Sequence, residues 1–382
     1  MGDAARPEPP VSLRVVQVSA ARDPRLRTGE EMLAAWPAVE MTARAAADAG
    51  FDTVVVQAAW RDEELVREGI RYRFVREPGG TAGRVVRRLR PRLADAVREL
   101  RPAVVHLQGL GFPHVGRLRG LGAAVLAQDH LDRVPVGWRR LERRRALARI
   151  DGVLFTAEGM ARPFFEAGVL RPGLPVHEVL EATSSFTPGD AEEARKRTGI
   201  GGDPCVLWLG HLDANKDPLT ILGAVSMALR SLPGLRLWMC FSTAPLELEV
   251  RARLAAEPGL AARVTLLGRV PHAEVEHLCR AADFLVQGSA REGTSYAVLE
   301  ALACGATPLV ADIPALRRMA GGAGGLFRRG DAAGLARLLE SYAARPRGEL
   351  RRAARAHFER HLSPAALSRE LGAAYQAAAR RR

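Results

Sequence analysis

The sequence predicts an α/β protein of two doubly wound domains, each built on a parallel β-sheet covered by helices. Three observations support this prediction. The 382 residues exceed what one ordinary hydrophobic core accommodates. Short apolar runs alternate with amphipathic helical stretches along the chain, which is typical of βαβ units. The alternation stops once, in the proline-containing stretch 181–189, and then starts again.

The first half contains short apolar runs, as expected for strands buried on both faces of a sheet. The predicted strands are Leu13–Ser19, Thr53–Gln57, Ala103–Leu107, Ala123–Ala127 and Gly152–Thr156. Between them, one helix is predicted over Glu31–Ala49, ended by Gly50, and another over Gly83–Leu100, ended by Pro102.

The second half repeats this pattern. The predicted strands are Pro204–Leu209, Leu235–Phe241, Arg263–Leu267, Asp283–Gln287 and Thr307–Val310. The predicted helices are Asp217–Leu232, Pro245–Ala255, His272–Arg280 and Thr294–Cys304, the last with Gly305 as its C-cap residue. We therefore expect an N-terminal domain over 1–182, a second domain over 183–362, and a final helix over 363–382 that packs back on the first domain.

Composition limits the function classes. The net charge of +13 is nearly all arginine, scattered along helices, and aromatic residues make up only 5%, which argues against nucleic-acid binding. No apolar run reaches the ~18–20 residues of a membrane span, and residues 1–10 lack an apolar signal core, so a cytoplasmic location is expected. Peripheral contact with the inner membrane face stays open. The four cysteines have no paired spacing and are expected to be buried free thiols.

The most informative motif runs from Gly288 to Gly305, after an apolar strand and into a helix. A helix start leaves its first amides without intrahelical partners, so the amides of 293–296 and the helix dipole favour an anion such as a diphosphate. Gly293 permits close backbone approach, and Thr294 or Ser295 can cap the helix.

Two carboxylates flank this helix start. Glu292 and Glu300 are eight residues apart, which separates them by roughly 10–12 Å on a helix. Glycosidases need a closer pair, so this spacing suits two ends of one elongated ligand, such as the sugar and ribose of a sugar nucleotide. The alternative is a solvated loop charge and a surface helix residue. The apolar run around Glu300 weighs against that alternative, because an unpaired charge there is costly.

A second motif, Leu209–Thr220, also joins a strand to a helix, with Asp217 at the cap and Pro218 at the first helical position. Lys216 is one of only two lysines among 56 basic residues. Its retention in an arginine-rich chain favours a compact ammonium for phosphate binding, although chance retention is the alternative.

Together these motifs resemble glycosyltransferase family 4, a group of retaining enzymes with the GT-B fold, in which two Rossmann-like domains face across a cleft. The matching pieces, in order, are Leu209-Gly210 with Lys216, the stretch 264–270, Ala281-Ala282-Asp283, and Glu292 with Glu300-Ala-Leu-Ala-Cys-Gly305. The N-terminal half matches the family only in its layout.

The resemblance implies a role for each matched residue. Glu292 would hold hydroxyls of the donor sugar, Glu300 would bind the ribose, and Lys216 would pair with the phosphates. His211 stands where the family usually has arginine, so this chain departs from the usual two-cation clamp at that position. Backbone groups would complete the donor site: Gly293 and Thr294 at the sugar, Ser295 and Tyr296 at the diphosphate, and Gly268, Arg269 and Val270 around the base.

The N-terminal half would supply the acceptor site and a catalytic histidine. His130, at the end of an apolar strand, is our choice, because His106 lies inside a strand and is interpreted as a core histidine. The family has a glycine-rich loop after the first strand. Here Gly29 is the only glycine of residues 20–29, so the resemblance assigns the acceptor-side phosphate contact to Gly29.

The resemblance therefore implies a retaining, metal-independent glycosyltransferase without a cofactor, which moves a sugar from a nucleoside-diphosphate sugar to a glycan, a lipid-linked molecule or a small molecule. No Asp-x-Asp pair is present to hold a divalent ion. Two alternatives stay open: a sugar-nucleotide epimerase or hydrolase on the same fold, and a non-catalytic protein that binds nucleotide sugars or glycans.

Overall fold

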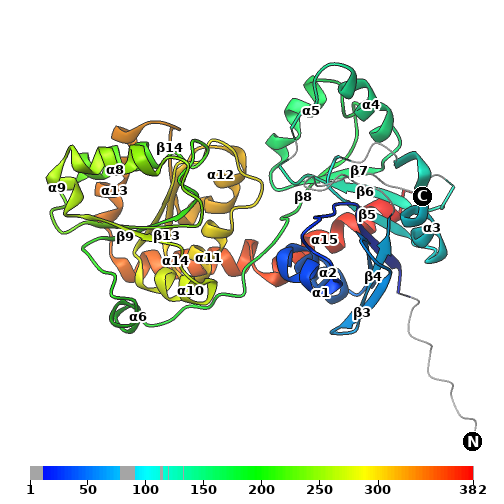
Figure 1. Cartoon of the computed structure of the whole chain (residues 1–382), viewed down its shortest axis with the longest axis horizontal. Coiled ribbons are helices and arrows are strands. Elements are labelled where there is room, and N and C mark those ends of the chain that lie inside the picture. Colours follow the sequence, from blue (N-terminus) through cyan, green and yellow to red (C-terminus); the bar gives the residue numbers. More distant parts are fainter. Residues whose placement is uncertain (1–11, 78–90, 112–114, 119, 132, 382) are drawn as a thin grey trace, which may run out of the picture. The chain divides into compact units, whose positions relative to one another are not determined.

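A computed structural model describes residues 12–77, 91–111, 115–118, 120–131 and 133–381. The chain divides into two compact units (Figure 1). The N-terminal unit comprises Met1–Phe155, Ala161–Val179 and Ser368–Arg382, and the C-terminal unit comprises Thr156–Met160 and Leu180–Leu367. Each unit contains one β-sheet with helices packed on it.

The sheet of the N-terminal unit has the strand order β3-β4-β2-β1-β5-β6-β7-β8. Its strands are β1 (Arg14–Ser19), β2 (Asp52–Ala59), β3 (Glu63–Arg67), β4 (Ile70–Arg76), β5 (Val104–Gln108), β6 (Ala124–Gln128), β7 (Gly152–Phe155) and β8 (Val176–Glu178). All neighbours pair in parallel except β3 and β4. The predicted parallel α/β architecture is therefore confirmed for this unit.

The helices described in or entering this unit are α1 (Gly29–Ala35), α2 (Pro37–Asp48), α3 (Pro91–Glu99), α4 (Trp138–Leu147), α5 (Arg162–Glu166) and α15 (Pro364–Ala379). The single helix predicted over Glu31–Ala49 is wrong: Trp36 leaves helical geometry, and Pro37 starts a new helix because it has no N–H to continue the first one. Of the helix predicted over 83–100, residues 83–90 lie outside the described part.

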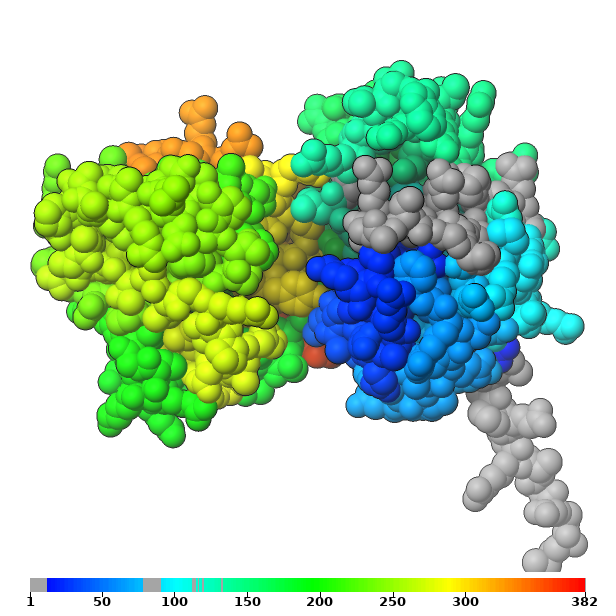
Figure 2. Space-filling model, viewed as in Figure 1, coloured from blue at the N-terminus to red at the C-terminus, as the bar shows by residue number. Residues whose placement is uncertain are grey.

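The β3–β4 hairpin was missing from the prediction. Its turn consists of Glu68 and Gly69, both with positive φ, which is the two-residue geometry that joins antiparallel strands. β3 alternates between partly buried and exposed residues at the sheet edge, so it lacks the apolar run used to find the other strands. The hairpin lies beside α1 on the surface of the unit (Figure 2).

The C-terminal unit has a wholly parallel sheet in the order β11-β10-β9-β12-β13-β14. Its strands are β9 (Cys205–Gly210), β10 (Arg236–Phe241), β11 (Val264–Gly268), β12 (Phe284–Gln287), β13 (Thr307–Ala311) and β14 (Gly325–Phe327). Numbered within the unit, this is the order 3-2-1-4-5-6 of a Rossmann-like sheet. The direction of winding changes between β9 and β12, which is where such sheets bind ligands.

The helices of the C-terminal unit are α6 (Ala191–Thr198), α7 (Pro218–Ala228), α8 (Glu247–Ala255), α9 (Pro258–Ala261), α10 (His272–Ala281), α11 (Tyr296–Cys304), α12 (Pro314–Ala320), α13 (Ala332–Ala343) and α14 (Arg347–His361). Gly305 ends α11 with a φ of 87°, as predicted for a C-cap glycine. Asp217 and Pro218 start α7 as predicted, and the Asp217 side chain accepts from the Thr220 N–H.

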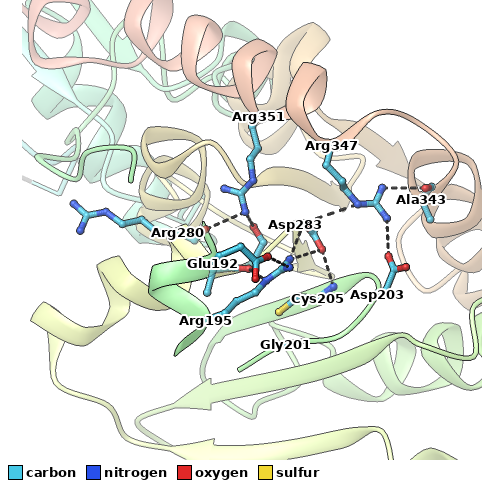
Figure 3. A network of polar contacts seen from close by, with 12 residues as sticks. Glu192, Arg195, Gly201, Asp203, Cys205, Arg280, Asp283, Ala343, Arg347 and Arg351 are labelled. Atoms are coloured by element: carbon cyan, nitrogen blue, oxygen red, sulfur yellow. Dashed lines mark hydrogen bonds and ion pairs between the residues drawn. The ribbon is translucent and has the colours of Figure 1, made fainter. Parts of the chain in front are cut away.

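A buried carboxylate holds the amino ends of β9 and β12 together. Asp283 accepts two hydrogen bonds from Arg195, each 3.1 Å long, and one from the Cys205 amide at 2.9 Å. Arg347 lies 3.9 Å from the same carboxylate, and Arg351 donates to two carbonyls of the segment that leads into β12 (Figure 3). Cys205 is free and buried, like the other three cysteines, which confirms that prediction.

Candidate functional site

The candidate site lies at the carboxyl ends of β9 and β12, the two central strands of the C-terminal sheet. β9 ends at Gly210 and leads into the loop 211–217, and β12 ends at Gln287 and leads into the loop 288–295. Because parallel strands end at the same edge, the two motifs that are about 80 residues apart in sequence become neighbours. The fold therefore brings Lys216 to Glu292.

Lys216 and Glu292 form an ion pair, with 2.5 Å between Nζ and Oε1. Their side chains are only 16% and 9% exposed, so water screens this pair little. Gln287 donates from Nε2 to the same Glu292 oxygen at 2.7 Å, and its Oε1 accepts from the Ser295 hydroxyl at 2.9 Å. Gln287 was not predicted as a site residue, although a polar residue that ends an apolar strand was a usable signal.

Asn215 joins the two loops. Its side-chain oxygen accepts from the Arg291 amide, and its side-chain nitrogen donates to the Arg291 carbonyl, both at 3.1 Å. Its own carbonyl accepts from the Ala290 amide at 2.8 Å. The loop that carries Lys216 is thus fixed against the loop that carries Glu292. Sequence analysis missed this residue, because its partners are 75 and 76 positions away.

Gly293 and Thr294 meet the segment that contains Glu181. A Cβ on Gly293 would lie 2.2 Å from Glu181 Oε1, so a larger residue would require the end of the Glu181 side chain to move. The Thr294 hydroxyl accepts from the Glu181 amide at 3.1 Å and lies 2.8 Å from the Thr156 hydroxyl. These side chains belong to the same compact unit. Glycine at 293 therefore lets the Glu181 carboxylate lie close to the backbone of this loop.

The start of α11 differs from the prediction in one respect. The helix begins at Tyr296 and Ser295 is its N-cap residue, but no side chain makes a capping bond there, because the Ser295 hydroxyl donates to Gln287 instead. The expected side-chain cap is therefore wrong. The Ser295 amide points at the Met319 sulfur, 3.5 Å away, which is a weak acceptor. An anion would be a stronger partner for that amide.

Glu300 lies in α11 and is buried, with 9% of its side chain exposed. Its Oε1 lies 2.7 Å from His272 Nε2, while the His272 ring is 74% exposed and stacks on Phe186. Burial raises the pKa of the Glu300 carboxyl, and the hydrogen bond and charge of His272 partly oppose this. Glu300 is therefore neither a surface helix residue nor unpartnered. His272 was not predicted as a partner.

The remaining predicted donor residues lie on neighbouring loops of the same edge. His211 is exposed directly after β9, with Nδ1 3.1 Å from the Ser242 hydroxyl that follows β10. Gly268 ends β11 with a φ of 68°, and Arg269 and Val270 follow it. Within the described part of the chain, no group of three or more His, Cys, Asp or Glu side chains is arranged to hold a metal ion.

In the N-terminal unit, His130 follows β6 at the carboxyl edge of the sheet. Its Nε2 lies 2.7 Å from Gln108 Oε1, at the end of β5. His106 is buried and hydrogen-bonded through Nδ1 to the Tyr375 hydroxyl of α15 at 2.7 Å. Burial lowers the pKa of His106 to about 3, so it is neutral at physiological pH. The structure therefore gives His106 the environment of a core histidine.

Gly29, the predicted acceptor-side residue, is the first residue of α1. Its amide donates to Glu63 Oε2 at 2.9 Å, and a Cβ at this position would lie 2.5 Å from the Phe74 ring. Packing against the β3–β4 hairpin thus accounts for a glycine here. A contact with an acceptor phosphate stays a prediction.

Residues 190–357 match the family described as glycosyl transferases group 1. This segment contains Lys216, Glu292 and Glu300. Over 200 residues the chain is 29% identical to the D-inositol 3-phosphate glycosyltransferase of Nocardia farcinica, covering 50% of this chain and 44% of the relative. It is 35% identical over 130 residues to the enzyme of the same description from Mycobacterium bovis, covering 33% and 26%. The matches thus span less than half the length of these relatives.

Solved structures match nearly the whole chain. The sucrose-phosphate synthase of Thermosynechococcus elongatus is 17% identical, with a TM-score of 0.66 over 96% of this chain and 98% of that one. The Anabaena protein HepE in complex with UDP is 13% identical, with a TM-score of 0.66 over 96% and 100%. The chain therefore has the fold of the GT-B glycosyltransferases, and its segment 190–357 is similar to glycosyl transferases group 1.

Proposed function

We propose that this protein is a glycosyltransferase that moves a sugar from a nucleoside-diphosphate sugar to an acceptor, with retention of configuration and without a metal. The observation that carries the proposal is the Lys216–Glu292 pair at the point where the C-terminal sheet changes direction, directly before α11. The family match of residues 190–357 and the GT-B fold support the same reading.

The geometry suggests how the site would bind a donor. An ammonium has three N–H donors, and Lys216 uses one on Glu292, so two are available in number for phosphate oxygens. The Lys216–Glu292 pair is formally neutral, however, and cannot offset a diphosphate by itself. The amides at the start of α11, the helix dipole and an N–H of His211 would supply the remaining positive potential. Fixed donors of this kind would also stabilise the leaving nucleotide.

Glu292 and Glu300 would bind opposite ends of the donor. Lys216 and Gln287 both bind Glu292 Oε1 at the β12 end. Among the described residues, Glu292 Oε2 makes no hydrogen bond, so this oxygen would accept from sugar hydroxyls. Glu300, two turns into α11, would accept from ribose hydroxyls, and His272 must then share or leave its oxygen. The identity of the sugar and base would depend on other contacts.

The two lysines provide the test. Thermal unfolding would be measured with UDP, GDP, ADP, UDP-glucose and GDP-mannose on the wild-type chain, Lys216→Ala and Lys196→Ala. Lys196 is exposed on α6 and is the matched control. A ligand at 100 times its Kd stabilises by ~2.7 kcal/mol. We expect this stabilisation in the wild type and Lys196→Ala and its loss in Lys216→Ala. Equal shifts in all three proteins would contradict the site.

Turnover then separates the alternatives. Incubation of the stabilising donor with glycan, lipid-linked and small-molecule acceptors should yield a transferred sugar with the anomeric configuration of the donor, and added EDTA should not change the rate. Isomerised or hydrolysed donor without an acceptor would indicate an epimerase or hydrolase. Donor binding without turnover would indicate a binding protein. His130 is our proposed catalytic histidine of the N-terminal unit, and His130→Ala should lower kcat without changing the thermal shift.

A further inference from the structure

Helix α4 of the N-terminal unit exposes apolar side chains that a folded protein normally buries. Val136, just before the helix, is 80% exposed, Trp138 is 72% exposed and Leu141 is 48% exposed. Trp138 and Leu141 are three residues apart and therefore share one helix face. The opposite face carries the buried residues Ala146 and Leu147, which attach the helix to the unit. The exposed face is thus apolar at its amino-terminal end.

The same helix is strongly basic. Its ten residues include five arginines and one acidic residue: Arg139, Arg140, Arg143, Arg144, Arg145 and Glu142. Four of the arginines, all but Arg143, take part in no ion pair between residues that the structure describes; Arg139 lies over the Trp138 ring at 5.7 Å. Elsewhere on this unit, Arg44, Arg67 and Arg73 pair with carboxylates, whereas these four arginines of α4 have no such partner among the described residues. Arg139, Arg140, Arg144 and Arg145 therefore give the helix a dense positive charge that no ion pair within the described part of the chain offsets.

This combination fits one kind of partner. A helix with a basic polar face and an exposed tryptophan and aliphatic residues is the pattern of helices that lie in the interface of an anionic bilayer. Tryptophan favours the headgroup level, and arginine can extend to the phosphates while its stem covers apolar surface. Three apolar side chains are too few for the ~800 Å² per partner of a stable protein interface. Among the described residues no helix is long and apolar enough to cross a membrane.

We propose that α4, with Val136, is a membrane-docking surface that places its Trp138–Leu141 face among the headgroups of an anionic lipid bilayer. Each arginine near such a surface strengthens binding about fivefold. The insertion of Trp138 and Leu141 adds a contribution that does not depend on salt. The proposal does not depend on the enzymatic activity, because it rests on exposure and charge in the N-terminal unit alone. In Figure 1, α4 lies on the outside of that unit, beyond β6 and β7.

The test is co-sedimentation of the full chain with vesicles of 1:1 phosphatidylglycerol and phosphatidylcholine, compared with phosphatidylcholine alone. We expect binding only to the anionic vesicles. Trp138→Ala should weaken it about tenfold, and Arg145→Glu, which changes the charge by two, about 30-fold. The matched controls lie on the β3–β4 hairpin of the same unit: Val66→Ala, where Val66 is 68% exposed, and Arg71→Glu. In the sheet, β4 is four strands from β6, the strand beside which α4 lies, so the two are ~19 Å apart. This distance exceeds the Debye length at physiological salt, so both control variants should bind vesicles like the wild type.

Quenching by brominated lipid locates the contact. Of the five tryptophans in the chain, Trp138 is the one whose side chain is largely exposed. Lipid that is brominated near the headgroups should therefore quench the tryptophan fluorescence of the wild type but not that of Trp138→Phe. Equal binding by wild type, Trp138→Ala and Arg145→Glu, or no binding to anionic vesicles, would overturn the proposal. A third result would also overturn it: the protein binds single-stranded RNA but not vesicles, and RNA binding is lost in Arg145→Glu but kept in Trp138→Ala. That result would indicate that the arginines of α4 bind a nucleic acid.

Discussion

Replacing Lys216 by methionine removes the ammonium that lies 2.5 Å from Glu292 Oε1, and replacing Glu292 by glutamine removes the opposite charge. Either single change leaves the other charge at a site where only 16% or 9% of the side chain is exposed. The double variant leaves no charge there. The three variants form a cycle that measures the interaction of this pair without any ligand.

The structure sets the expected magnitude. Two unit charges 4 Å apart attract by ~4 kcal/mol at an effective dielectric constant of about 20. The cost of desolvating both groups cancels much of this attraction. We expect each single variant to destabilise the C-terminal unit by ~2–4 kcal/mol. The double variant should cost ~1–3 kcal/mol less than the sum of the two single variants, and this difference is the coupling energy of the pair. An exposed pair would give only ~0–1 kcal/mol.

Hydrogen exchange measured by mass spectrometry on peptides from β9 and β12 is the suitable assay. It reports the stability of the C-terminal unit locally and does not require the whole chain to unfold in one step. A coupling of 1–3 kcal/mol corresponds to a ~5- to 150-fold deviation from additive protection factors. Additivity within ~0.5 kcal/mol would refute the pairing, and with it the site built on Lys216 and Glu292.

Three further outcomes follow from buried charges. Because burial raises the pKa of Glu300, the stability tied to its protonation is present below pH ~4.5 and is lost as pH rises through the raised pKa. Glu300→Gln should therefore raise the melting temperature at pH 7 but not at pH 4, and it should weaken nucleotide binding. An unchanged melting temperature at pH 7 would contradict this. The pKa of His106 is depressed to about 3 by burial, so the N-terminal unit should lose stability as pH falls from ~6.5 toward 3, and exchange in β5 should show a smaller pH slope in His106→Gln. Asp283→Ala leaves Arg195 without its buried partner, so it should destabilise β9 and β12 by ~3–5 kcal/mol, measured by hydrogen exchange. A loss below ~1 kcal/mol would show that the network of Figure 3 is not needed for stability.

Much of the fold could be predicted from the sequence because the information is local. Buried parallel strands such as β9 and β13 are short apolar runs, and glycine at 305 and proline at 218 mark helix ends through their own backbone limits. The same local rules located both motifs of the candidate site, since each joins a strand to a helix. The β3–β4 hairpin was missed because an edge strand alternates in burial and carries no apolar run.

The sequence alone determined that Lys216, Glu292 and Glu300 are unusual for their surroundings: a rare lysine, a carboxylate before a helix start, and a carboxylate within an apolar run. Only the tertiary structure decided that Lys216 pairs with Glu292 and that Glu300 pairs with His272. The physical reason is that strand order, which depends on packing of the whole sheet, chooses which loops become neighbours. Residues far apart in the chain carry no local trace of that choice.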